Sequence, residues 1–271
     1  MKEWKFGVST VESSPEGVLL LQGSIEENLR TAAKLGYSAI EIHMREEVEP
    51  DYASVKAVME ETGVAIAQIV TGKLNTEGMC SLMDDRPYVS AAALAGMKKY
   101  VDIASQLGAN IVVGWVKGNV PAGKAPDKYM ERLAANLRIL NDYAKPKNVK
   151  LNIEVINHYE VNVFTTAKAV VEFLEKYQLD NCYAHLDTFH MQLEEDNMAD
   201  AIRTAKDHLG YFHIADSQRW YPGSGEMNYV PIFQALEEVG YDGYVTVECF
   251  RRGDGVGTAK KAIEYLKNLK Y

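Results

Sequence analysis

Four residues of the types that bind metal ions close successive apolar segments of the chain. Glu154, Asp187, His213 and Glu248 are separated by 33, 26 and 35 residues and end the segments LNIE, YAHLD, YFH and YVTVE. Each interval fits one strand plus one helix, so we expect the four side chains to converge at one rim of a parallel barrel. Three carboxylates and one imidazole at one place predict a metal site.

An oxygen-rich ligand set with a single nitrogen indicates the kind of ion. It suits Mn²⁺, Mg²⁺ or Co²⁺ better than a structural Zn²⁺, and we expect Mn²⁺. Such an ion can polarise the carbonyl of an α-hydroxy ketone and acidify the neighbouring C–H bond. Glu154 and Glu248 are the candidate acid/base pair. Because they would lie three strands apart, they could address opposite faces of a flat enediolate, as an epimerase requires.

Further side chains after the predicted strands are candidate substrate contacts: His43, Trp115, Glu160, His190 and Arg219. Arg219 offers a fixed cation for substrate oxygens, and Glu160 could accept a substrate hydroxyl. Trp115 could form an apolar wall against the C–H face of a sugar. His185 is expected to be a hydrogen-bonded histidine of the core and not a ligand.

The sequence predicts that alternating strands and helices position these residues. Segments with helical periodicity separate the apolar runs, which predicts a single (β/α)₈ TIM barrel over residues 1–271, with a doubly wound sheet as the second possibility. The longest irregular stretches, 71–87 and 114–126, follow the third and fourth strands. The expected strands are 5–9, 38–43, 65–70, 110–114, 149–156, 181–186, 211–215 and 243–248.

Side chains alternate along a strand, so parity predicts which residues face the barrel interior. Asn152 and Glu154 share one face of their strand, and Leu151 and Ile153 share the other. The same rule turns the other three predicted ligands inward. It also turns Glu41 and His43 inward on the second strand.

The amino-acid composition limits the classes of partner that this protein can bind. A formal net charge of -9 and a pI near 5.3 argue against nucleic acid, which requires a basic face. The sequence contains no apolar stretch of membrane-spanning length and begins without the h-region of a signal peptide, so we expect a cytoplasmic protein that does not bind membranes. Three separated cysteines favour free thiols over a disulfide framework.

The segments IEVINHYE, LDTFHMQLEE, FHIADSQRWYPGSGE and GYDGYVTVEC resemble the xylose isomerase-like TIM-barrel superfamily and, within it, the ketose 3-epimerases of the tagatose/psicose group. The stretches VVGWVKG and FHIADSQRWYPGSGEM are more similar to the 5-keto-L-gluconate epimerase branch. The resemblance implies metal ligation by the four residues above, acid/base roles for Glu154 and Glu248, substrate contacts from Glu160, His190 and Arg219, and a dimer or tetramer. Lys73 and Lys117, in the early loops, could favour a carboxylate-bearing substrate.

These observations predict a divalent-metal-dependent epimerase of a free ketose or keto-sugar acid that inverts the carbon next to the carbonyl through a cis-enediolate. An aldose–ketose isomerase on the same scaffold is the first alternative. An endonuclease IV-like phosphodiesterase would require more histidine ligands and a basic groove, and a non-catalytic sugar-binding protein would show no turnover.

Overall fold

Parallel strands close into a barrel in the computed structural model, which describes residues 2–14 and 17–271. Within these residues, eight strands form the ring in the order β1-β3-β4-β5-β6-β7-β8-β9, and β9 pairs back onto β1. A doubly wound sheet stays open, so this closure confirms the (β/α)₈ fold. The ring comprises β1 (Lys5–Val11), β3 (Ala39–His43), β4 (Ala65–Val70), β5 (Asn110–Val113), β6 (Leu151–Glu154), β7 (Cys182–Asp187), β8 (Leu209–Ile214) and β9 (Tyr244–Val247).

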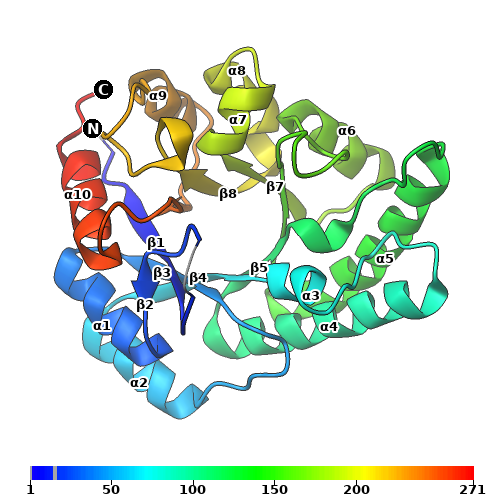
Figure 1. Ribbon diagram of the computed structural model, residues 1–271, viewed down its shortest axis with the longest axis horizontal. Helices are drawn as coiled ribbons and strands as arrows, with labels where there is room; N and C mark the ends of the chain where they lie inside the picture. Colours follow the sequence, from blue (N-terminus) through cyan, green and yellow to red (C-terminus); the bar gives the residue numbers. More distant parts are fainter. Residues whose placement is uncertain (1, 15–16) are drawn as a thin grey trace.

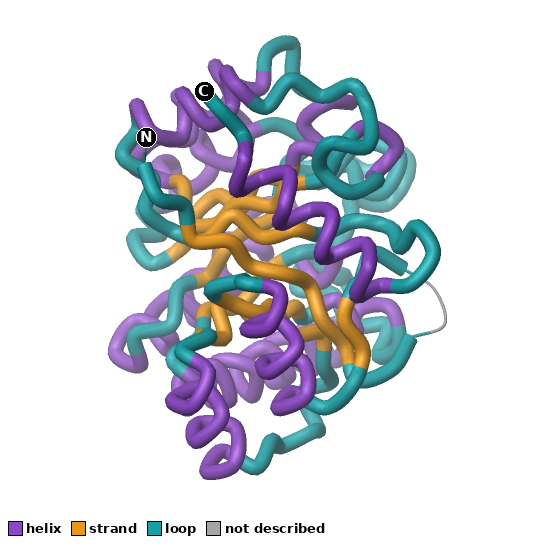
Figure 2. Tube along the Cα trace, turned by 90° about the vertical axis from the view of Figure 1, so that its left-hand side faces the viewer, coloured by secondary structure: helices purple, strands orange, loops and turns teal. Residues whose placement is uncertain are grey.

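Helices surround the strands (Figure 1), and the view from the side shows them flanking the sheet (Figure 2). The α-helices are α1 (Ile25–Leu35), α2 (Tyr52–Thr62), α3 (Gly72–Thr76), α4 (Pro87–Leu107), α5 (Asp127–Ala144), α6 (Ala167–Tyr177), α7 (Thr188–Glu194), α8 (Met198–Ala205), α9 (Val230–Glu238) and α10 (Gly255–Asn268). The 3₁₀ turns are η1 (Trp115–Lys117), η2 (Lys145–Lys147), η3 (Lys206–His208) and η4 (Ser217–Arg219). None of the helices in the described ranges is both long and apolar enough to cross a membrane.

Three details differ from the predicted pattern of one helix per strand. The short strand β2 (Leu21–Gln22) pairs with the end of β1, and α3 and η1 occupy stretches expected to be irregular. The connection from β7 to β8 contains both α7 and α8. The carboxylate of Asp187 caps α7 by accepting from the Phe189 N–H at 2.8 Å, so this helix begins directly at the strand end.

Strand parity is confirmed by the two sides of the sheet. Leu151, Ile153 and the equivalent residues of other strands pack in one large core between the sheet and the helices. A small cluster of Ala39, Ala67 and Tyr211 fills the inside of the barrel. Above it the interior is polar, and its buried side chains include Glu41, Gln68, Asn152, His185, His213 and Thr246. The barrel therefore carries hydrogen-bonding groups directly beneath its carboxyl rim.

A buried threonine ties together the ends of β7 and β8, the strands that carry Asp187 and His213. Thr188 Oγ1 accepts from the Ala215 N–H at 2.8 Å and donates to the Ala215 carbonyl at 2.8 Å. Tyr229 also donates to that carbonyl. Loss of the Thr188 hydroxyl would therefore leave the Ala215 N–H without an acceptor, whereas the Ala215 carbonyl would keep Tyr229 as a donor.

We expect Thr188→Val, which keeps the shape but removes the hydroxyl, to lower the free energy of unfolding by about 1–3 kcal/mol, because it leaves a buried N–H without its acceptor. Urea unfolding measures the change. Thr204→Val is the control, since Thr204 is exposed and its hydroxyl donates to Asp200 O within a helix. Equal losses in the two variants would contradict the prediction.

Candidate active site

The four predicted ligands meet at the carboxyl rim of the barrel. Glu154 ends β6, Asp187 ends β7, His213 lies in β8, and Glu248 follows β9 directly. One potential ligand atom from each lies within 4.8 Å of the others. Asp187 and His213 are direct partners in the β7–β8 register, so strand pairing itself fixes part of the cluster. The arrangement could hold one metal ion.

The His213 ring has one nitrogen engaged and one open. Its Nε2 lies 2.8 Å from Glu41 Oε2, deep in the barrel. Its Nδ1 is buried and has no hydrogen-bond partner among the described residues. This nitrogen faces Glu248 Oε2 at 3.5 Å and Asp187 Oδ2 at 4.0 Å. A buried nitrogen without a partner, facing carboxylate oxygens, fits the donor set of a divalent metal.

The two glutamates of the cluster differ in their tendency to ionise. Burial and the charge of Glu248 raise the pKa of Glu154 to about 8. Burial also opposes ionisation of Glu248, but Arg219 and His213 outweigh it and hold its pKa well below the ordinary value. A pair of carboxyl groups whose pKa values are pushed apart suits an acid and a base acting together.

Arg219 provides the positive charge at the rim. Its Nη2 bonds Glu248 and lies 3.5 Å from Asp187 Oδ2, while the guanidinium stacks on the Phe189 ring at 4.7 Å. The residue adopts a left-handed backbone with φ of +59°, an unusual conformation for a non-glycine residue. The side chain predicted to bind substrate oxygens thus also contacts two of the predicted metal ligands.

Asp216 shapes the loop that holds Arg219 in this conformation. Its carboxylate accepts from the backbone N–H groups of Ser217 and Met227 through Oδ1 and of Gly223 through Oδ2, at 2.8–3.1 Å. Burial would raise the pKa of Asp216, yet these backbone donors lower it below the ordinary value. The carboxylate therefore closes the segment that contains PGSGE back onto the end of β8.

His190 lies beside the cluster as a neutral ring. Burial and then Arg219 lower its pKa well below the ordinary value. Its Nδ1 accepts from the Asn157 N–H at 3.3 Å, which places the ring proton on Nε2. That Nε2 lies 3.9 Å from Glu154 Oε1 and 3.8 Å from Asp187 Oδ2. The same Asn157 donates to Glu160 at 2.9 Å and so positions a second predicted contact.

A cavity of about 360 Å³, called here the site cavity, opens above the cluster. All five predicted substrate contacts line it together with both glutamates: His43, Trp115, Glu154, Glu160, His190, Arg219 and Glu248. Asp187 and His213 lie buried beneath it. Trp115 is 40% exposed and presents an apolar surface to the cavity.

Two expectations need correction. Neither ring nitrogen of His185 has a hydrogen-bond partner in the described part of the chain, because the ring packs edge-on against His213 and Tyr211. Lys117 is completely buried and donates to the Gly114 carbonyl at 3.2 Å, so it cannot contact substrate as proposed. Burial lowers its pKa to about 8. Lys73 does line the site cavity.

Three residues that shape the candidate site received no role from the sequence. Strand parity placed Glu41 in the interior, but its bond to His213 crosses from β3 to β8 and has no local signal. Asp216 is recognisable only as an acidic residue after a strand. Gly114 makes room for the site, because a Cβ there would lie 2.7 Å from Glu154 Oε2.

Comparisons with known proteins identify the family of this barrel. The family model described as xylose isomerase-like TIM barrel matches residues 29–269. L-ribulose 3-epimerase of Methylomonas sp. (strain DH-1) is 31% identical over 222 residues, which cover 81% of this chain and 76% of that protein. 3-dehydro-D-guloside 4-epimerase of Escherichia coli (strain K12) is 27% identical over 255 residues, covering 90% and 91%.

Among solved structures, D-allulose 3-epimerase from Methylomonas sp. in complex with D-allulose superimposes with a TM-score of 0.83 at 27% identity. The match covers 98% of this chain and 97% of that one. These relatives are named as sugar epimerases, and this chain has the fold of such enzymes. The extent of the family match and the shared barrel fold lead to one conclusion: the chain belongs to the xylose isomerase-like TIM barrel family.

Proposed function

We propose that this protein is a divalent-metal-dependent epimerase that inverts the carbon next to the carbonyl of a keto sugar, with Glu154 and Glu248 as its acid/base pair. The observation that carries the proposal is the His213 ring, whose Nδ1 is open toward Asp187 and Glu248 while Nε2 is held by Glu41. The names of the relatives support epimerisation of a sugar.

Glu154, Asp187, His213 and Glu248 would hold the ion, with Mn²⁺ as the proposed metal. When bound, the ion would act as a Lewis acid that polarises the substrate carbonyl. Arg219 and the Nε2–H of His190 would orient oxygens at the carbonyl end, and Glu160 would accept a substrate hydroxyl. Trp115 would cover the C–H face and limit the access of water.

The ion pair of Glu248 with Arg219 suggests the direction of proton transfer, because it favours the ionised form of Glu248. Glu248, held ionised, takes the proton from the carbon next to the carbonyl, and the electron pair of that C–H bond delocalises onto the carbonyl oxygen as an enediolate. Glu154 then returns a proton, taken up from solvent, to the opposite face. Glu248 ends the reaction protonated and Glu154 ionised, so solvent must restore both before the next turnover.

The exchange of substrate hydrogen with solvent tests this function directly. We expect protein supplied with Mn²⁺ in D₂O to incorporate deuterium at the carbon beside the ketone and to form the epimer, as followed by NMR, and EDTA to stop both. Glu154→Gln and Glu248→Gln should each slow exchange by about 10²–10⁴-fold or more, because each removes an acid/base group. Glu172→Gln is the control, since Glu172 is exposed on α6.

Activity retained by both active-site variants would overturn the two-glutamate assignment. Deuterium that appears in an aldose product would replace epimerisation by aldose–ketose isomerisation, the alternative on the same scaffold.

Glu41 should set the metal affinity through His213. Replacement by Gln removes the negative charge that faces Nε2, so we expect Glu41→Gln to weaken Mn²⁺ binding by about 10–100-fold, the usual effect of losing an outer partner of a metal-bound histidine. Isothermal titration calorimetry measures the affinity without requiring turnover. Glu61→Gln, on the outer surface of α2, removes the same charge at a distance. Equal affinities in the two variants would remove Glu41 from the metal site.

Metal binding should tighten as the pH rises. Burial raises the pKa of Asp187 to about 6, and burial together with Glu248 raises that of Glu154 to about 8. Both groups must lose a proton to bind a cation. The same holds for His213, because Glu41 and Glu248 outweigh burial and raise the pKa of its ring well above the ordinary value. Protons therefore compete with Mn²⁺. We expect affinity to rise between pH 6 and 8, by about tenfold per unit for each proton displaced. Calorimetry in buffers of different ionisation enthalpy counts those protons; an affinity that falls or stays constant would contradict the assignment.

A further inference from the structure

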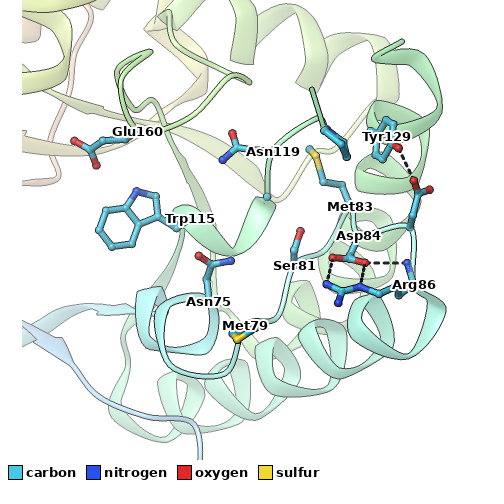
Figure 3. A pocket seen from close by; sticks show the side chains of 13 residues that line it. Asn75, Met79, Ser81, Met83, Asp84, Arg86, Trp115, Asn119, Tyr129 and Glu160 are labelled. Atoms are coloured by element: carbon cyan, nitrogen blue, oxygen red, sulfur yellow. Dashed lines mark hydrogen bonds and ion pairs between the residues drawn. The ribbon is translucent and has the colours of Figure 1, made fainter. Parts of the chain in front are cut away.

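A second, larger cavity continues outward from the site cavity. It encloses about 890 Å³ and is lined by residues of the segments that follow β4 and β5. We call it the Trp115 groove and define it by Asn75, Met79, Ser81, Trp115, Asn119 and Tyr129. Trp115 and Glu160 line both cavities, so the two spaces share a wall. Figure 3 shows these two residues at one end of the groove and Arg86 and Tyr129 at the other.

The size of the two spaces indicates a substrate longer than one sugar. The site cavity, at 360 Å³, lies at the small end of the range of about 300–1,000 Å³ typical of ligand pockets, and the groove alone approaches the large end. A single keto sugar held at Glu154 and Glu248 would leave the groove unused. A substituent directed past Trp115 would enter it.

The lining of the groove has the chemistry of carbohydrate recognition. Trp115 is 40% exposed and Met79 is 72% exposed, so both offer apolar surface to the C–H face of a sugar. Asn119 accepts from the Asn162 N–H at 2.7 Å through its carbonyl oxygen, which fixes the side chain and leaves its amide nitrogen turned to the groove (Figure 3). Asn75 and Ser81 add further hydrogen-bonding groups.

The charges of the groove exclude an anionic substituent. Arg86 is the only cation among the described lining residues, and its Nε and Nη2 both bond Asp84 at 2.8 Å. Asp85 is likewise paired, with Lys128 at 2.5 Å and Arg132 at 3.0 Å. A phosphate or carboxylate would find carboxylates around it and no unpaired guanidinium to bind it. The groove therefore suits a neutral, hydroxyl-rich group.

We infer that the preferred substrate is a keto sugar that carries a neutral glycosyl substituent, with the keto unit at the glutamates and the second sugar on Trp115, Asn119 and Asn75. This inference rests on the proposed function. It names the substrate class of that site as a keto-glycoside, where the sequence suggested a free ketose or a keto-sugar acid.

Deuterium incorporation rates on three probes test the inference: a free ketose, a methyl keto-glucoside, and a disaccharide with the same keto unit. We expect kcat/KM to rise at least about tenfold from the methyl compound to the disaccharide, corresponding to one or two good hydrogen bonds and a stacked face. Asn119→Asp keeps the acceptor for the Asn162 N–H but loses the amide donor. It should lower the ratio of disaccharide to methyl kcat/KM by about tenfold.

Asn110→Asp is the matched control, because Asn110 Oδ1 accepts from the Lys150 N–H at 2.9 Å at the start of β5, outside both cavities. It should leave that ratio unchanged. Exchange with equal kcat/KM for all three probes would overturn the glycoside inference and leave the epimerase proposal standing. A dimer whose interface covers the groove would have the same consequence. Exchange with none of the probes would overturn both.

Discussion

The bond between Glu41 and His213 is the interaction on which the site depends. It joins β3 to β8, which are separated in the ring by β1 and β9, so it spans the interior of the closed barrel. Burial of the ionised Glu41 carboxylate costs free energy. His213 and His43 offset this cost and hold the pKa of Glu41 below its ordinary value. The same bond fixes the orientation of the His213 ring and leaves Nδ1 at the rim, where the other ligands arrive from β6, β7 and β9.

Charge compensation follows from this geometry. Glu154, Asp187 and Glu248 lie within a few ångströms of one another, with Arg219 as the cation in contact with two of them. Repulsion and burial keep Glu154 from ionising easily, whereas Glu248 ionises readily beside Arg219. A divalent cation bound between these carboxylates would relieve the repulsion. The charges that we propose to hold the metal are thus the ones that we propose to move protons.

The sequence predicted the strands and the convergence of four metal-type side chains well, because both depend on short-range periodicity. The alternation of side chains placed Glu154 and His213 inward, and the spacing of strand plus helix brought them to one rim. Features that depend on contacts distant in sequence were not predictable. Three such features follow from three-dimensional packing: the burial of Lys117 under its own turn, the left-handed backbone of Arg219, and the His185 ring, which has no hydrogen-bond partner in the part of the chain that the structure describes. The groove beyond Trp115 forms from two loops that the sequence marked only as irregular.

The central claim is that one metal ion binds where the open nitrogen of His213 meets the three carboxylates. Anomalous X-ray diffraction from crystals soaked in Mn²⁺, collected at the manganese edge, tests it most directly. The account predicts one strong peak at bonding distance from His213 Nδ1 and from oxygens of Glu154, Asp187 and Glu248, with the Glu41 bond to Nε2 intact. A peak between Glu41 and His43, or no peak in the barrel, would contradict it.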